Sequence, residues 1–320
     1  MNKSSTSGSV PATKYIKPNP FKMLLKNVKE HPWLYVLFLP VLAYFLVFHY
    51  WPMYGVIIAF KDYKPMKGIF ASNWVGFANF AQFLNGPYLW RLVRNTLSIN
   101  LGMLLVAFPL PIIFALLLNE CRSVKFRKVV QTVTYMPHFV SSVVVCSLML
   151  IFCRSNGVIT TMLSVFGMPQ TNLFSIGKFF QPLYIAMNVW QELGWDSIIF
   201  FAALTSIDAS LYEAAQVDGA GRWRQMWHVT LPGIAPTIVI LLILRIGNLM
   251  SLGWDRIYLL YNEMIYEQAD VISTYVYRTG LQQMQYSYST AVGLMNSVIN
   301  VILLVGANVV SRKVNDTSLW

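Results

Sequence analysis

The chain has 320 residues, of which 56% are hydrophobic and 12% are charged, and its formal net charge is +11. Soluble domains carry about 25% charged residues, so this apolar fraction cannot be hidden in one water-soluble core, and a lipid bilayer is the expected solvent. The positive charge does not indicate nucleic-acid binding, because the Lys and Arg residues are split among many loops and form no single patch.

The first predicted segment is a flexible basic cytoplasmic tail over 1–32, and residues 1–20 of it are rich in Ser, Thr, Lys and Pro. An apolar stretch begins at about residue 34. It is too long and too far from the N-terminus for a cleaved signal peptide. We therefore expect it to remain as the first transmembrane helix.

Six stretches approach or exceed the roughly 20 apolar residues that a helix needs to cross about 30 Å of hydrocarbon. They are continuously apolar, whereas a transmembrane β-barrel needs segments of about ten residues with alternating polarity. We therefore predict an all-α integral membrane protein, with a six-helix domain over 33–313 and a cytoplasmic C-terminal tail over 314–320. The predicted spans are about 34–54, 95–118, 137–153, 183–206, 234–253 and 288–310.

The orientation follows from the basic residues that flank the spans. With the N-terminus inside, the inner segments hold more of the 24 Lys and Arg residues than the longer outer loops. Because positive charge concentrates on the cytoplasmic side of membrane proteins, both termini are expected in the cytoplasm.

A polar segment over 207–233 separates two of the most apolar stretches, and this orientation places it in the cytoplasm. Ser210 and Glu213 stand three apart and can form a capping box, so we expect a short helix to begin near Leu211. Gly219 then ends it, because glycine tolerates the positive φ of a helix-ending residue.

A second helical stretch is expected after this turn. Trp223, Met226 and Trp227 recur at helical spacing as an apolar stripe, and Pro232 is expected to end the helix and permit a new one at the membrane surface. The predicted product is two short helices joined by a sharp turn. Such a piece either docks another protein or rests on its own bundle.

The same segment resembles the EAA motif of binding-protein-dependent ABC permeases. In that motif Glu-Ala-Ala is followed after three residues by Gly, and after nine more by Ile-x-Leu-Pro. Val229 stands where isoleucine is commonest. The matching residues are Glu213, Ala214, Ala215, Gly219, Leu231 and Pro232.

Other stretches extend the resemblance over nearly the whole chain. "WVGFANFAQFL" at 74–84 resembles the outer segment after the first span of carbohydrate-type permeases. The stretches at 269–281 and 289–313 resemble the oligosaccharide and polysaccharide branch of the family, which is labelled LplB-like.

The resemblance implies the type I importer fold and a place in a bacterial cell membrane. It also implies a second, related permease as a heterodimer partner, two cytoplasmic ATPase subunits that bind ATP and Mg, and an extracytoplasmic binding protein that delivers a carbohydrate. The ATPase-coupling residues would be Glu213, Ala214, Ala215, Asp218, Gly219, Leu231 and Pro232.

The chain itself is not expected to be an enzyme or to hold a cofactor. The stretch from Gly219 to Trp223 lacks the Lys and Ser or Thr of a phosphate-binding loop, so ATP hydrolysis belongs to partner subunits. The four histidines are scattered and the three cysteines show no zinc spacing, so no metal site is predicted.

Charged side chains inside spans are costly and usually face a cavity or a partner. Counted at about 1.5 Å per residue, Asp196 and Arg245 lie at roughly equal depths of 17–18 Å, and Glu192 at roughly 22 Å. We predict that Arg245 pairs with Asp196 or Glu192. The polar set that forms either the substrate path or a structural ion pair is Asn188, Glu192, Trp195, Asp196, Arg245 and Asn248.

Two other functions stay open at this point. A secondary transporter would use the intramembrane carboxylates for ion coupling and would show broken helices in matched halves. An ABC permease could also carry another class of solute, because the sequence does not name a sugar.

Overall fold

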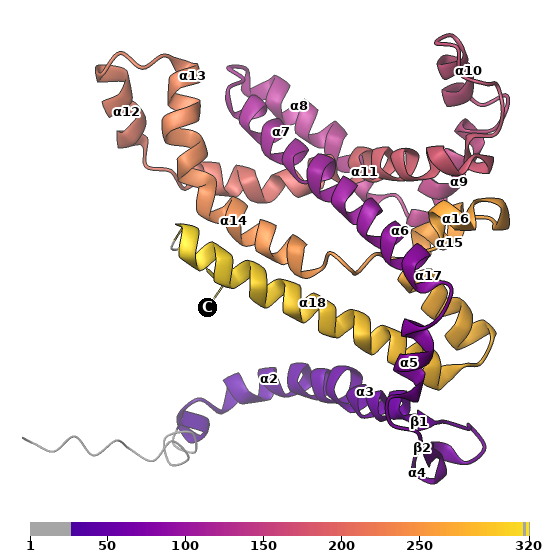
Figure 1. Ribbon diagram of the computed structural model, residues 1–320. Coiled ribbons are helices and arrows are strands. Elements are labelled where there is room, and N and C mark those ends of the chain that lie inside the picture. Colours follow the sequence, from indigo (N-terminus) through magenta and orange to yellow (C-terminus); the bar gives the residue numbers. More distant parts are fainter. Residues whose placement is uncertain (1–26, 316–317, 320) are drawn as a thin grey trace, which may run out of the picture. The chain divides into compact units, whose positions relative to one another are not determined.

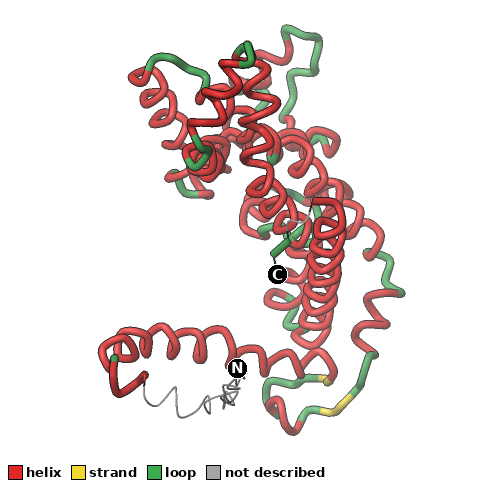
Figure 2. Tube along the Cα trace, turned by 90° about the vertical axis from the view of Figure 1, so that its left-hand side faces the viewer, coloured by secondary structure: helices red, strands yellow, loops and turns green. Residues whose placement is uncertain are grey.

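The computed structural model describes residues 27–315 and 318–319, and this part of the chain is almost entirely helical (Figures 1 and 2). Its only strands are β1 (Lys61–Asp62) and β2 (Asn73–Trp74), which pair antiparallel. Most of the tail predicted over 1–32, and residues 316–317 and 320 of the C-terminal tail, lie outside the described residues. The chain divides into two compact units, Met1–Gly55 and Val56–Trp320.

The first unit contains the first predicted span. The helix α2 (Pro32–Phe45) continues through a π-helical turn η1 (Leu46–Tyr50) into α3 (Trp51–Met53), and the 3-10 stretch η2 (Tyr54–Phe60) follows. The whole stretch Pro32–Phe60 is long and apolar enough to cross a membrane. Its large apolar side chains from Trp33 to Tyr54 are exposed, as expected for a surface that meets lipid or another membrane subunit.

The second unit contains three further helical stretches of this length and hydropathy. The first joins α6 (Leu89–Gly102), η3 (Met103–Ala107) and α7 (Pro109–Asn119); the second joins α13 (Arg222–Gln225), η6 (Met226–Thr230) and α14 (Leu231–Gly247); the third is α18 (Tyr286–Asn315). The long helix α11 (Gly177–Thr205) packs against α7, and α14 packs against α18 (Figure 1).

The third predicted span, 137–153, is wrong as a continuous helix. The stretch consists of η4 (Met136–Phe139), which ends α8 (Val124–Tyr135), and of α9 (Ser142–Phe152), with a bend of 97° between the two parts. Pro137 disfavours a continuous helix, and the Ser141 side chain accepts a hydrogen bond from the Val144 amide and so starts a new one. At about 1.5 Å per residue, α9 is only about 16 Å long and cannot cross the hydrocarbon alone.

A second bend, of 69°, separates α11 from α12 (Ala209–Val217). In the described part of the chain four helices can cross a membrane by length and hydropathy, and up to six can if each bent pair counts as one span. Six spans therefore require that the break between α8 and α9 lies within the membrane region.

The fifth span also differs from the prediction. Its helix ends at Gly247, not near residue 253, and it begins at Arg222, because Pro232 does not end the preceding helix. The π-helical turn η6 lies directly before this proline. A widened turn relieves the clash between a proline ring and the carbonyl four residues earlier, so one continuous helix runs over Arg222–Gly247.

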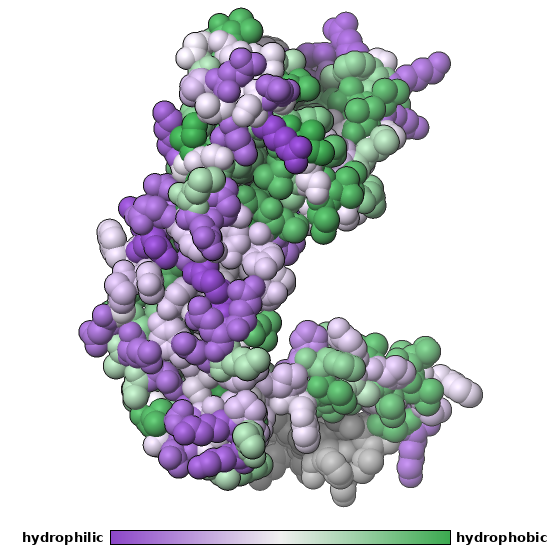
Figure 3. All heavy atoms as spheres, turned by 90° about the vertical axis from the view of Figure 1, so that its right-hand side faces the viewer, coloured by the Kyte–Doolittle hydropathy of each residue, from purple (hydrophilic) through white to green (hydrophobic). Residues whose placement is uncertain are grey.

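Short helices fill the connecting segments, and most of them lie in the regions predicted to be outside the cell. They are α4 (Gly68–Ala71), α5 (Ala78–Leu84), α10 (Val158–Ser164), η5 (Leu173–Ser175), α15 (Trp254–Leu260), η7 (Glu263–Ile265), α16 (Tyr266–Ala269), α17 (Ile272–Tyr277) and η8 (Arg278–Gln282). In the view of Figure 3, the surface of the second unit has hydrophilic areas next to hydrophobic areas. This is expected where loops in water adjoin spans in lipid.

Three buried apolar clusters hold the second unit together, and α11 contributes to two of them. Phe180 and Tyr184 of α11 pack in one cluster with Ile257 of α15, and Phe200 packs in another with Ile112 of α7. The third cluster joins α5 and α6 to α17 and α18. The central position of α11 means that its polar residues face several neighbouring elements.

The backbone of another helix approaches α11 closely at Gly194. A Cβ atom there would lie 2.2 Å from the carbonyl oxygen of Thr134 in α8, which is a backbone atom that cannot move aside cheaply. Any side chain at this position would therefore push α8 away from α11.

We expect Gly194→Ala to destabilise the protein by about 1–3 kcal/mol, because overpacking forces the backbone to shift. The measurement is the melting temperature of the purified protein in detergent. Gly293→Ala in α18 is the matched control, because a Cβ atom at Gly293 has no neighbour within 4 Å. Equal melting temperatures for the two variants would contradict the close packing of α8 on α11.

Candidate functional site

A cluster of charged and polar side chains lies where α11 meets three other elements. The Glu192 carboxylate is its centre: one oxygen accepts a hydrogen bond from Arg256 of α15 at 2.8 Å, and the other lies 2.6 Å from Nδ1 of His138 in η4. Arg256 also bonds the side chain of Asn188, one turn earlier on α11. The ring of Trp195 stacks on His138, with centroids 4.2 Å apart.

The second ion pair of the cluster joins α11 to α14. The guanidinium of Arg245 lies 3.6 Å from the Asp196 carboxylate. The helical count placed these residues at equal depth, and the structure selects Asp196 over Glu192 as the partner of Arg245. Asn248 follows on the same helix end, where its side chain donates to the carbonyl of Leu244 at 3.0 Å.

Two cavities border this cluster. One has a volume of about 250 Å³ and is lined by both carboxylates, both arginines and Asn188. The other has a volume of about 630 Å³ and is lined by Trp195, Asp196, Arg245 and Asn248. All six residues of the predicted polar set therefore line one or both cavities, and Asp196 and Arg245 line both.

Sequence reasoning missed Arg256 and His138. The fifth span predicted over 234–253 leaves Arg256 outside it, and the prediction of no metal site gives His138 no other role. One signal was available for Arg256. A carboxylate within a span needs a cationic partner, and Arg245 could satisfy only one of Glu192 and Asp196.

The predicted coupling segment lies at the other end of α14. Asp208, not Ser210, is the N-cap of α12: its side chain accepts a hydrogen bond from the Ser210 amide at 2.9 Å, so the predicted capping box with Glu213 is wrong. The helix begins at Ala209, earlier than predicted, so Ser210 lies inside its first turn. The hydrogen bond from the Ser210 backbone lowers the pKa of Asp208, which stays ionised at the positive end of the helix.

The turn after α12 has the geometry that the sequence predicted. Gly219 has φ +75°, its amide bonds the carbonyl of Gln216 at 3.0 Å, and the Ala220 amide bonds the carbonyl of Ala215 at 2.8 Å. This pair of bonds is a Schellman motif, which requires a left-handed residue at the position of Gly219. Glycine takes that conformation without steric cost.

Most of the predicted coupling residues are accessible. Glu213, Ala214, Asp218, Gly219 and Pro232 are exposed, whereas Ala215 and Leu231 are half-buried. The apolar stripe of the second arm does not rest on its own bundle as a whole, because only Met226 is buried, while Trp223 and Trp227 are 69% and 60% exposed.

One hydrogen bond joins α12 to the following helix, and a second joins the turn between them to that helix. The Tyr212 hydroxyl lies 3.1 Å from the hydroxyl oxygen of Thr230, and the Gln225 side chain donates to the carbonyl of Ala220 at 2.7 Å. A cavity of about 480 Å³ lies between the segment and the end of α7, and it is lined by Glu120, Tyr212 and Gln225 among others. The segment therefore presents an exposed helix that is tied to the base of the helix carrying Arg245.

Comparison with known proteins defines the class of this membrane protein. Residues 107–316 match the family described as binding-protein-dependent transport system inner membrane component. The chain belongs to this family: it is a multi-pass inner-membrane permease subunit of an ABC importer, and not the ATPase.

Individual relatives cover nearly the whole chain. It is 47% identical over 294 residues to Protein LplB of Bacillus subtilis (strain 168), and the aligned region covers 92% of each chain. It is 45% identical over 300 residues to the polygalacturonan/rhamnogalacturonan transport system permease protein YteP of the same organism, which covers 93% of this chain and 94% of YteP.

Solved structures agree with this assignment. The fold matches a chain of a bacterial ABC transporter involved in the import of the acidic polysaccharide alginate, with a TM-score of 0.83, 42% identity, and coverage of 92% of this chain and 99% of that chain. A second structure of an alginate ABC transporter, in complex with an alginate pentasaccharide-bound periplasmic protein, gives a TM-score of 0.84 at the same identity and coverage. The predicted all-α importer fold is confirmed. The family and fold matches contradict the alternative of a secondary transporter.

The two ion pairs of the cluster should differ in their effect on stability. Glu192 has two charged or polar partners within 2.8 Å and its side chain is 23% exposed, whereas Asp196 has one partner at 3.6 Å and its side chain is 36% exposed. Removing one member of the less exposed pair, which has the shorter contacts, leaves an uncompensated charge, and this costs more than the loss of a longer and more exposed pair.

We expect Glu192→Gln to lower the free energy of unfolding by about 3 kcal/mol. Asp196→Asn, the matched variant on the same helix, should lower it by about 1 kcal/mol or less. Yield and melting temperature of the purified variants measure the difference. A larger loss for Asp196→Asn would show that the Arg245 pair carries the packing of α11.

Proposed function

We propose that this permease subunit imports oligosaccharides or polysaccharide fragments. The proposal depends chiefly on the permease YteP, a polygalacturonan/rhamnogalacturonan transporter by its description, which is 45% identical over 93% of this chain. The fold match to the alginate transporter supports the same solute class. Import of another solute class by this ABC permease is the alternative.

The subunit would act within a larger assembly. A second, related permease would complete the translocation path, and two cytoplasmic ATPase subunits would bind ATP and Mg. An extracytoplasmic binding protein would deliver the saccharide. The alginate transporter offers a precedent, since it is described in complex with a saccharide-bound periplasmic protein.

The coupling segment would meet the ATPase subunits. Exposed Glu213 and the small residue Ala214 allow close approach of another surface, and the hydrogen bond between Tyr212 and Thr230 would pass a displacement of α12 to the helix Arg222–Gly247. At about 1.5 Å per residue, Arg245 lies about 22 Å from Thr230 along this one helix. Movement at the cytoplasmic end would therefore reach the cavity directly.

The polar cluster would line the path of the saccharide. Asn188, Glu192, Trp195, Asp196, Arg245 and Asn248 offer hydrogen-bond donors, acceptors and one aromatic face to the two cavities. Polar groups at membrane depth are costly unless they pair with one another or serve a passing solute. ATP binding and hydrolysis would alternate the access of these cavities between the two sides of the membrane.

Gly219→Val is expected to uncouple transport from ATP hydrolysis. A β-branched residue opposes φ +75°, so the turn that presents α12 would be lost. In proteoliposomes with the partner subunits, stimulation of ATPase activity by the binding protein should fall at least about tenfold, which corresponds to 1.4 kcal/mol of lost coupling. Gly221→Val is the matched control, because Gly221 has φ −70° and a Cβ atom there has no neighbour within 4 Å.

Glu213→Lys tests the docking surface itself, because this exposed side chain has no part in capping α12. Unchanged ATPase stimulation in both Gly219→Val and Glu213→Lys would refute the coupling role of the segment.

The solute class is tested on the cognate binding protein. We expect oligosaccharides to raise its melting temperature, because a ligand that binds only the folded state stabilises that state, by an amount that grows with the logarithm of the ligand concentration over Kd. A panel should include acidic and neutral oligosaccharides, amino acids and metal ions. Stabilisation by amino acids or metal ions alone would overturn the carbohydrate assignment.

A further inference from the structure

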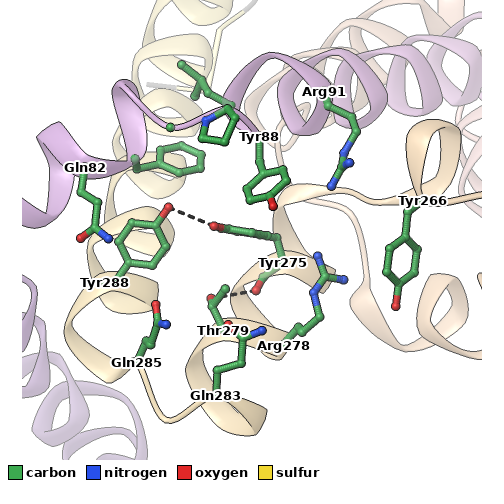
Figure 4. Close-up of a pocket in the computed structure, with 14 residues that line it drawn as sticks. Gln82, Tyr88, Arg91, Tyr266, Tyr275, Arg278, Thr279, Gln283, Gln285 and Tyr288 are labelled. Carbon is green, nitrogen blue, oxygen red and sulfur yellow. Dashed lines mark hydrogen bonds between the residues drawn. The ribbon is translucent and has the colours of Figure 1, made fainter. Parts of the chain in front are cut away.

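A pocket separate from the two intramembrane cavities opens among the segments predicted to be outside the cell. It has a volume of about 540 Å³ and lies between the end of α5, the start of α6, the segment from α16 to η8, and the start of α18 (Figure 4). Small-molecule sites are commonly 300–1,000 Å³ in volume. The pocket is therefore large enough for a sugar ring and part of its neighbours.

Two arginines give this pocket a surplus of positive charge. Arg91 and Arg278 both line it, and Figure 4 shows their guanidinium groups near one another, on the side of the pocket where Tyr266 lies. The fully buried carboxylate of Asp270 accepts hydrogen bonds from Arg278 at 2.6 Å and from Arg91 at 3.1 Å. One carboxylate thus faces two guanidinium groups, and among the described residues that line the pocket none is acidic.

The neighbouring groups preserve this positive charge. Burial opposes the charge of Arg278, but its hydrogen bond and charge attraction to Asp270, together with its interactions with Tyr261, outweigh burial and raise its pKa. Burial also raises the pKa of Tyr261 to about 12, so that hydroxyl stays neutral beside Arg278 at physiological pH. Asp270 receives a further hydrogen bond from Thr274 at 2.9 Å, which holds the carboxylate in place behind the arginines.

Aromatic rings form the walls of the pocket. The guanidinium of Arg91 lies 5.0 Å from the ring centroid of Tyr88, and that of Arg278 lies 4.9 Å from Tyr266 and 5.6 Å from Tyr275. These contacts hold the positive groups against flat surfaces. Pyranose rings stack on such surfaces, while hydroxyl and amide groups at the rim supply hydrogen bonds.

We propose that this pocket binds a uronate residue of an acidic oligosaccharide on its way to the membrane cavities. The sugar carboxylate would accept hydrogen bonds from Arg91 and Arg278, and the sugar ring would pack on the tyrosines. A guanidinium fork matches the geometry of a carboxylate. This inference rests on the proposed function and narrows its cargo to acidic saccharides.

Gln283→Glu is the most direct test, because Gln283 lines the pocket, is exposed and lies outside the ion-pair network of Asp270. The change conserves the shape of the side chain and adds a negative charge to the pocket, which would repel the sugar carboxylate. Its neighbour Gln282 does not line the pocket and instead bonds the Tyr258 hydroxyl, so Gln282→Glu is a matched control for charge. Arg91→Gln is a second variant that leaves Asp270 paired with Arg278.

The assay measures by calorimetry the binding of trigalacturonate to the complete transporter in nanodiscs, without its binding protein. Neutral maltotriose is the reference probe. We expect trigalacturonate to bind wild type and Gln282→Glu alike, and to bind Gln283→Glu and Arg91→Gln about fivefold or more weakly. The affinity should also fall as salt is added.

Unchanged trigalacturonate binding in both pocket variants, or equal binding of maltotriose to wild type, would overturn the uronate site. Weakened docking of the binding protein in the variants, with trigalacturonate binding unchanged, would also overturn it and would identify the pocket as a protein contact. Uptake by proteoliposomes separates the two proposals. Import of neutral oligosaccharides alone refutes only the uronate site, whereas import of no saccharide refutes the proposed function.

Discussion

The cost of placing ionised side chains at membrane depth determines much of this structure. Glu192 and Asp196 stand on one helix, and each finds its cationic partner on a different element, Arg256 on α15 and Arg245 on α14. Because an unpaired charge in hydrocarbon is so unfavourable, these pairs restrict how the three elements can be arranged. Two polar cavities border these pairs, next to an apolar cluster that packs α11 against α7.

A second constraint concerns the connection between the cytoplasmic segment and the cavities. The π-helical turn before Pro232 lets one continuous helix extend from Arg222 in the polar segment to Gly247 in the bundle. The close packing of Gly247 against Leu304 of α18 holds the far end of this helix. A continuous helix of this kind would carry a displacement of the polar segment toward the cavities, which suits a subunit driven by another protein.

Much of the fold and part of the site could be predicted from sequence. Long apolar stretches depend on composition alone, and the positive φ of Gly219 depends on local sterics, so both were predictable. The pairing of Arg245 with Asp196 followed from helix geometry once the spans were placed.

The remaining features depend on tertiary contacts or on small differences between local competitors. Asp208 and Ser210 are both good helix caps two residues apart, and sequence could not rank them. The break before Ser141 separates α8, a helix of mixed polarity, from the apolar α9, and hydropathy alone does not fix where one ends and the other begins. The role of Arg256 depends on where the fifth span ends, and that in turn depends on packing against α18.

The ring of two carboxylates and two guanidiniums around the smaller cavity has a formal charge of zero. A cavity with a large net charge would hold an oppositely charged solute tightly and release it slowly, whereas transport requires binding that is weak enough to leave. Balanced charge offers local hydrogen bonds without a long-range electrostatic well. Turnover would then be limited by the opening of the cavity and not by escape of the cargo from it.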